Sequence, residues 1–213
     1  MTLTREVPLD PAQSALLIVD VQNFSAKREG AEFAHLSDEE FDTKYGDFFK
    51  QVWAETIPNI RRLQDACRAA GVEVMFTTIE SLTLDGRDRS LDYKITGFNV
   101  PKGSWDGKPV DEIAPVGDEI VLPKSSSSVF VSTHIDYILR NLGVRQLVIT
   151  GLVTDQCVES AIRDACDLGY LVTQVTDACL TYTPERQAAS INAIKGYCRQ
   201  VTTDELCAEL AVT

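Results

Sequence analysis

The segment VITGLVTDQCVES, residues 148–160, carries the clearest structural signal of the chain. An apolar run breaks at Gly151, and Cys157 follows where we expect the first turn of a helix. A strand that leads into a helix is the building unit of a parallel sheet covered by helices on both faces. The segment therefore favours an α/β fold.

The same alternation runs along the rest of the chain. Apolar strands are predicted at residues 15–20, 72–78, 119–122, 146–150, 171–175 and 198–201. Helices are predicted from Trp53 to Gly71, from Ser132 or Thr133 to Gly143, from Cys157 to Gly169, after Pro184 and at the C-terminus. We therefore expect a single domain, residues 1–213, with three α/β/α layers and a doubly wound parallel sheet.

Two segments lack a clear pattern. Residues 23–45 are polar, and we expect a loop that holds at most one helical turn. Residues 79–117 show little periodicity and many Gly and Pro residues, so we expect a long loop, of a kind that is often functional.

The composition excludes several classes of function. The 213 residues carry a net charge of −12, which repels phosphate backbones and anionic membranes, so neither nucleic acid nor a membrane is an expected partner. We find no N-terminal signal and no apolar run near ~18 residues, and we expect a cytoplasmic location. The six cysteines include no Cys-x-x-Cys pair, and we expect them to be reduced.

Cys157 is the first candidate for chemistry. Free N–H groups and a partial positive charge at a helix N-terminus lower the pKa of a thiol and can hold an oxyanion. Taken alone, a small buried cysteine that closes a strand–helix turn explains Cys157 slightly better. Histidine usually accepts the proton of such a thiol, but neither His35 nor His134 follows a predicted strand.

Two further residues change this interpretation. Asp20 ends one predicted strand and Lys124 follows another, so both are expected at the sheet edge where Cys157 lies. A buried carboxylate can accept the thiol proton, and a lysine can stabilise both anions. Separately, the three residues are explained by a turn cap, an exposed lysine and core packing. Their expected position together at one edge of the sheet favours a nucleophilic site.

Three segments carry a resemblance to a known family. LLIVDVQ (residues 16–22), VLPKSSSSVF (121–130) and VITGLVTDQCVESAIRD (148–164) are similar, in the same order, to motifs of the isochorismatase-like cysteine hydrolases. The resemblance implies an isochorismatase-like, Rossmann-like fold and hydrolysis of a small amide through a thioester. It also implies a homodimer or homotetramer.

The resemblance further implies roles for particular residues. Asp20, Lys124 and Cys157 would form a catalytic triad. A cis peptide bond would join Leu152 to Val153, and the N–H groups of Val153 and Cys157 would form the oxyanion hole.

The expected substrate is a small ureido, carbamoyl or simple amide. Residues 100–106 (VPKGSWD) and 110–112 (VDE) are similar to ureidoacrylate amidohydrolases. Nicotinamidases of the family hold a metal through histidines after the second strand, but residues 77–81 (TTIES) contain none, so we expect no metal and no other cofactor. Isochorismate hydrolases cleave a vinyl ether and need no thiol, so Cys157 argues against that activity.

Seven residues are candidates for substrate binding: Gln22, Phe24, Glu80, Arg87, Arg89, Trp105 and Phe130. An arginine could grip a substrate carboxylate by a bidentate pair, but interspersed acids make a solvated charged loop the better explanation for each arginine. Trp105 and Phe130 could wall a pocket or fill the core, because both uses bury the ring.

Other functions stay open at this level. The chain could bind a small ligand without turnover, although binding alone does not require a paired acid and thiol. A nicotinamidase or isochorismatase activity is a further alternative, as is a redox sensor, because a thiol of low pKa oxidises readily.

Overall fold

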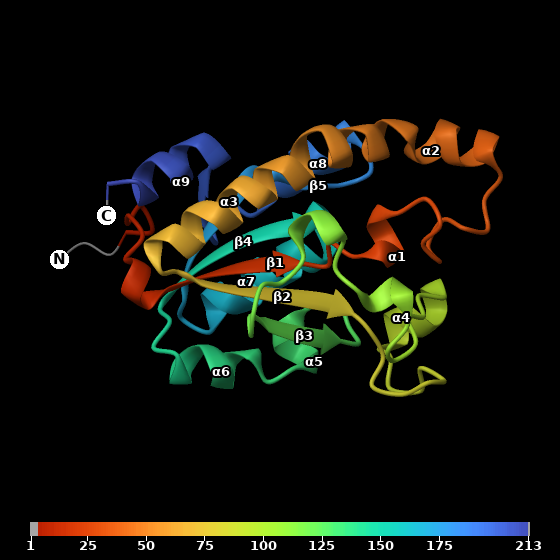
Figure 1. Cartoon of the computed structure of the whole chain (residues 1–213), viewed down its shortest axis with the longest axis horizontal. Helices are drawn as coiled ribbons and strands as arrows, with labels where there is room; N and C mark the ends of the chain where they lie inside the picture. Colours follow the sequence, from red (N-terminus) through yellow and green to blue (C-terminus); the bar gives the residue numbers. More distant parts are fainter. Residues whose placement is uncertain (1–3, 213) are drawn as a thin grey trace.

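The structure is a computed structural model that describes residues 4–212. Within these residues, six strands form one sheet in the order β3-β2-β1-β4-β5-β6, and every pair is parallel (Figure 1). The strands are β1 (Ser14–Val19), β2 (Glu73–Ile79), β3 (Ile120–Lys124), β4 (Gln146–Leu152), β5 (Leu171–Leu180) and β6 (Arg199–Val201). This order is doubly wound, with its switch point between β1 and β4, as the sequence predicts.

The helices are α1 (Asn23–Ala26), α2 (Asp38–Gln51), α3 (Ile57–Ala70), α4 (Leu91–Thr96), α5 (Val129–Ser132), α6 (Ile135–Asn141), α7 (Glu159–Asp167), α8 (Pro184–Ala193) and α9 (Thr203–Leu210). Two π-helical turns, Val52–Thr56 and Thr154–Val158, precede α3 and α7. Short 3-10 turns lie at Pro11–Gln13, Trp105–Gly107 and Asp111–Ile113.

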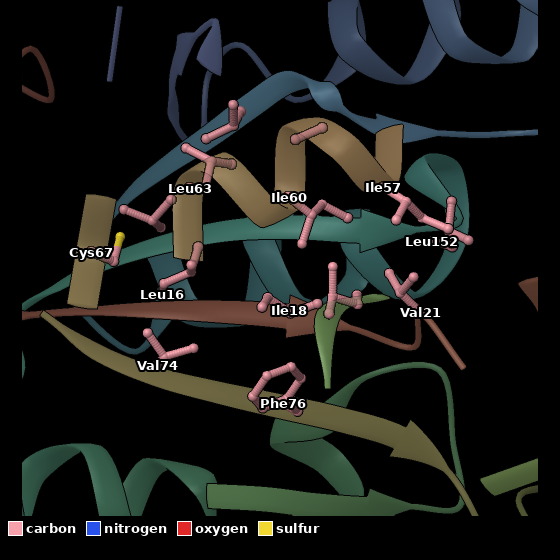
Figure 2. Packing of buried hydrophobic residues seen from close by; sticks show 14 of the residues in the cluster. Leu16, Ile18, Val21, Ile57, Ile60, Leu63, Cys67, Val74, Phe76 and Leu152 are labelled. Atoms are coloured by element: carbon pink, nitrogen blue, oxygen red, sulfur yellow. The ribbon is translucent and has the colours of Figure 1, made fainter. Parts of the chain in front are cut away.

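The core has one half on each face of the sheet. Alternate strand residues pack against α3 and α9 on one face and against α5, α6 and α7 on the other, which gives the three layers (Figure 1). The apolar residues of α3 recur at helical spacing and lie over β1, β2 and β4 (Figure 2): Ile57, Ile60, Leu63 and Cys67. Gly71 ends this helix in the left-handed conformation, as predicted.

The expectation of a loop over residues 23–45 is wrong for its last part, because α2 begins at Asp38. Ser37 accepts a hydrogen bond from the Glu40 N–H, and the Glu40 side chain accepts one from the Ser37 N–H, which together form a capping box. The acidic residues that suggest a polar loop form the first turn of the helix, where negative charge is favourable. β4 and β5 also extend beyond their predicted ends, to Leu152 and Leu180.

Candidate active site

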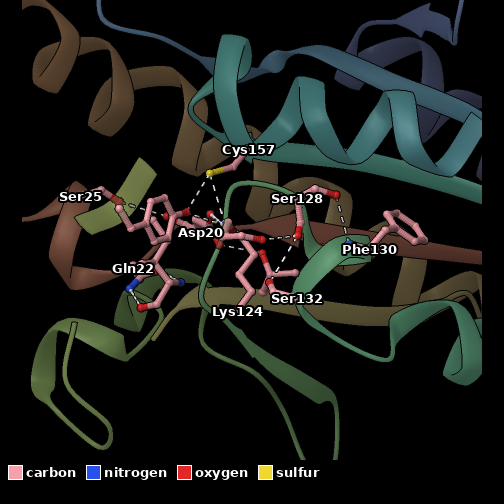
Figure 3. A network of polar contacts seen from close by, with 12 residues as sticks. Asp20, Gln22, Ser25, Lys124, Ser128, Phe130, Ser132 and Cys157 are labelled. Atoms are coloured by element: carbon pink, nitrogen blue, oxygen red, sulfur yellow. Dashed lines mark hydrogen bonds and ion pairs between the residues drawn. The ribbon is translucent and has the colours of Figure 1, made fainter. Parts of the chain in front are cut away.

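Four adjacent strands deliver side chains to one place at the carboxyl edge of the sheet (Figure 3). Asp20 follows β1, Thr77 lies near the end of β2, Lys124 ends β3, and Cys157 follows β4. The structure therefore brings together the three residues that the sequence analysis places at this edge.

Lys124 is the centre of the cluster. Its Nζ lies 2.8 Å from Asp20 Oδ2, in an ion pair whose side chains are 0% and 2% exposed. The same Nζ donates to Cys157 Sγ at 3.4 Å, to the Ser126 carbonyl at 2.8 Å and to the Tyr93 hydroxyl at 3.2 Å. One buried ammonium thus contacts both the acid and the thiol.

The two oxygens of Asp20 have different surroundings. The Thr77 hydroxyl donates to Oδ1 at 2.7 Å, whereas Oδ2 faces Lys124 and accepts no hydrogen bond from the described residues beyond that ion pair. The Asp20 backbone adopts a left-handed φ of 54°, and its N–H donates to the Thr77 carbonyl at 3.1 Å. A non-glycine residue held in this region by its neighbours is typical of functional sites.

The surroundings of Cys157 favour the neutral thiol over the thiolate. Burial raises the pKa of Cys157 to about 12, Lys124 acts in the opposite direction, and the negative charge of Asp20 raises it further. This overturns the expectation of a lowered thiol pKa, because loss of solvent outweighs the nearby cation. Burial alone would lower the pKa of Lys124, but Asp20, Cys157 and Tyr93 together raise it, so the lysine is charged.

The turn that precedes Cys157 has the backbone implied by the resemblance. A cis peptide bond joins Leu152 to Val153, and Cys157 lies in the π-helical turn that leads into α7. Gly151 has a φ of 125°, and a Cβ there would lie 2.1 Å from the Val19 carbonyl oxygen. Only glycine therefore allows β4 to approach β1 this closely beside Asp20.

A small cavity lies next to the thiol. Its volume of about 20 Å³ has room for a single water molecule. The lining residues come from distant parts of the chain: Asp20, Ser25, Glu32, Ile79, Phe98, Leu152, Val153, Gln156, Cys157 and Tyr182.

None of the seven candidate substrate-binding residues lines this cavity. Gln22 is buried and bonds the backbone of Ile79 and Asp106, and Phe24 packs edge-on against Phe98 at 5.4 Å. Phe130 packs against the core near Tyr170.

The other four candidates lie within residues 79–117, where the expectation of an unbroken long loop is wrong, because α4 and two 3-10 turns form there. Glu80 accepts from the Gly103 N–H at 3.1 Å, and Trp105 is 48% exposed. Arg87 is exposed and pairs with Asp85, whereas Arg89 donates to the carbonyls of Gly86 and Phe98. These contacts organise the loop rather than reach the thiol.

Sequence reasoning missed several residues that do surround the site. Thr77 carries a detectable signal, because it is a polar residue near the end of an apolar strand and pairs in register with Val19. Tyr93, Phe98, Glu32 and Tyr182 come from segments without periodic patterns, and only the tertiary structure brings them here.

Neither a metal-holding group of side chains nor a membrane-spanning helix is found among the described residues. In residues 4–212, no group of three or more His, Cys, Asp and Glu side chains is placed to hold a metal ion. No helix among these residues is long and apolar enough to span a membrane.

Residues 14–205 match the model of a known protein family, the isochorismatase domain. The chain belongs to the isochorismatase family. A family relative, the ureidoacrylate amidohydrolase RutB of Rhizobium rhizogenes, is 30% identical over 223 aligned positions, which cover 96% of this chain and 86% of the relative.

Two solved structures share the fold. A cysteine hydrolase from Pseudomonas syringae pv. phaseolicola 1448A superposes with a TM-score of 0.83 and 23% identity, over 97% of this chain and 96% of its own. N-carbamoylsarcosine amidase from Thermoplasma acidophilum superposes with a TM-score of 0.66 and 26% identity, over 90% of this chain and 97% of its own.

Proposed function

We propose that the protein is a cysteine-dependent amidohydrolase that cleaves the C–N bond of a small ureido, carbamoyl or amide compound. The observation that carries the proposal is the buried contact of one ammonium, Lys124 Nζ, with both Asp20 and Cys157. The relatives named ureidoacrylate amidohydrolase and N-carbamoylsarcosine amidase support the substrate class.

The first half of the reaction forms a covalent intermediate. Because burial raises the pKa of the Cys157 thiol, Asp20 takes its proton as the sulfur attacks the substrate carbonyl carbon. Oδ2 is the acceptor in this proposal, because Thr77 already occupies Oδ1. The backbone N–H groups of Val153 and Cys157 hold the oxyanion, and Lys124 balances the negative charge on the sulfur.

The second half regenerates the enzyme. Asp20 returns the proton to the departing ammonia or amine, and the C–N bond breaks to leave a thioester on Cys157. Asp20 then deprotonates a water molecule, which attacks the thioester, and the acid leaves as the thiol recovers its proton. A ureido substrate releases ammonia and a carbamate, which loses carbon dioxide.

The test measures ammonia release from a panel of ureido acids, carbamoyl amino acids and simple amides. Cys157→Ala is expected to abolish release while the unfolding transition is retained. Cys179→Ala is the matched control, because that thiol is also buried, with a pKa raised to about 12, but lies outside the cavity. Substantial activity of purified Cys157→Ala, or an inactive wild type across the panel, contradicts the proposal.

A further inference from the structure

A second, larger cavity lies beside the catalytic one. It is a groove of about 480 Å³ between α2 and α8, a volume typical of small-molecule sites. Its lining is mostly apolar, and the residues that form it are Asp47, Phe48, Gln51, Leu180, Thr181, Tyr182, Thr183, Pro184, Gln187, Ala188 and Ile191. Asp47 is the charged residue in this lining, so the groove offers no cation to an anionic group.

Tyr182 lines both cavities. Its hydroxyl donates to Glu32, which also lines the catalytic cavity. On the other side its ring packs against Phe48, with the ring centroids 4.9 Å apart. Tyr182, which is half-buried, is therefore the residue that lines both the groove and the cavity at the thiol.

The two cavities differ greatly in size. The cavity at Cys157 holds about one water molecule, whereas an amide substrate contains several heavy atoms. Phe98, on the opposite wall, packs against Phe24 and Tyr93, and Arg89 holds its carbonyl at 2.6 Å. On the Tyr182 side, the neighbouring space is the groove, which this residue also lines.

We propose that this groove is the binding site for an uncharged alkyl or aryl substituent of the substrate, reached when Tyr182 swings away from Glu32. The inference rests on the proposed amidohydrolase function and refines its substrate class to amides and carbamoyl compounds with an apolar chain. The substituent replaces water in an apolar groove, and each buried methylene favours binding about threefold or more.

The test is a homologous series of primary amides and N-alkylureas, from acetamide to octanamide and from methylurea to octylurea. For the wild type, kcat/KM is expected to rise about threefold per added methylene until the groove is filled. Ala188→Trp, on the exposed side of α8, fills the groove and is expected to remove this rise while acetamide and methylurea are cleaved as before. Gln51→Trp fills it from α2 with the same result.

Ala189→Trp is the matched control, because Ala189 is the exposed neighbour on α8 that does not line the groove. Calorimetric binding of the same series to Cys157→Ala gives a readout independent of turnover. The inference is overturned if neither kcat/KM nor binding affinity changes with chain length. It is also overturned if Ala188→Trp and Ala189→Trp have equal effects. A change of oligomeric state in Ala188→Trp alone likewise overturns it, because that result assigns the groove to a subunit contact.

The two proposals fail in different ways. Chain-length-dependent binding without hydrolysis of any compound overturns the amidohydrolase function and leaves the groove as a ligand site. Hydrolysis that is independent of chain length overturns the groove and leaves the function.

Discussion

Lys124 and Asp20 form an ion pair of 2.8 Å in which both side chains are almost wholly buried. Such a pair is tolerated only while both charges are present, because either one alone is stranded without solvent. The stability of the fold and the proposed chemistry therefore depend on the same ion pair.

Breaking this pair is expected to destabilise the fold. Lys124→Met leaves a buried carboxylate without its cation, and we expect the free energy of unfolding to fall by about 3–5 kcal/mol. Asp20→Asn combined with Lys124→Met removes both charges and is expected to cost less than the two single changes added together. Urea denaturation of the three variants measures this coupling, and strictly additive losses contradict it.

Asp20→Asn is expected to separate thiol reactivity from turnover. The charge of Asp20 raises the pKa of Cys157, so its removal lets Lys124 stabilise the thiolate. We expect iodoacetamide to label Cys157 about tenfold faster at neutral pH, the gain for a fall of one pKa unit, while ammonia release is lost. Mass spectrometry of the labelled peptide gives the rate, and unchanged labelling counts against this charge interaction.

The pH dependence of Cys157 labelling in the wild-type protein tests the same thiol pKa. With a thiol pKa raised to about 12, the labelling rate of Cys157 is expected to increase continuously up to pH 10. A plateau below pH 8 is the contrary result, since it means a thiolate already present at rest. Cys179 is the internal comparison, because burial also raises its pKa to about 12.

Glu32 is expected to make stability depend on pH. Burial raises its pKa from 4.5 to about 7, against the opposing effect of the hydrogen bond from Tyr182. Between these values the unfolded chain loses the proton that the folded protein retains, so the free energy of unfolding falls as pH rises from 4.5 to 7. Glu32→Gln removes this contribution. Unfolding of both proteins at pH 5 and pH 7.5 measures it, and equal changes in the two refute it.

Gly151→Ala is expected to be among the most damaging small substitutions. Its methyl group would lie 2.1 Å from the Val19 carbonyl oxygen, so β1 and β4 must separate at the site. We expect a loss of roughly 3 kcal/mol or more, or failure to fold. Gly169→Ala is the control, because φ is also positive there, at 93°, but no atom lies within 4 Å. Equal losses in both variants show that backbone strain, and not the close approach, is responsible.

Much of the architecture is readable from the sequence, because continuous apolar runs mark strands and glycines mark helix ends. The cluster of Asp20, Lys124 and Cys157 is readable for the same reason, since each residue follows a run of this kind. The start of α2 was also marked, by Ser37 followed by Glu40, but the neighbouring acids obscure that signal.

Other features depend on contacts between distant segments. The upward shift of the Cys157 pKa follows from burial. Part of that burial comes from Tyr93 and Phe98, which lie in a segment without periodicity. The candidate Arg89 fails to reach the thiol because its guanidinium bonds carbonyls of its own loop. Neither the Cys157 pKa shift nor the contacts of Arg89 can be read from the spacing of residues along the sequence.

The spread of the site over four neighbouring strands also has a consequence for synthesis of the chain. Asp20, Thr77 and Lys124 leave the ribosome before Cys157, and β4, which carries the turn to Cys157, occupies the middle of the finished sheet. A nascent polypeptide that stops short of residue 146 lacks both Cys157, the proposed nucleophile, and the strand that positions it. Under the proposed function, incomplete chains are therefore without amidohydrolase activity.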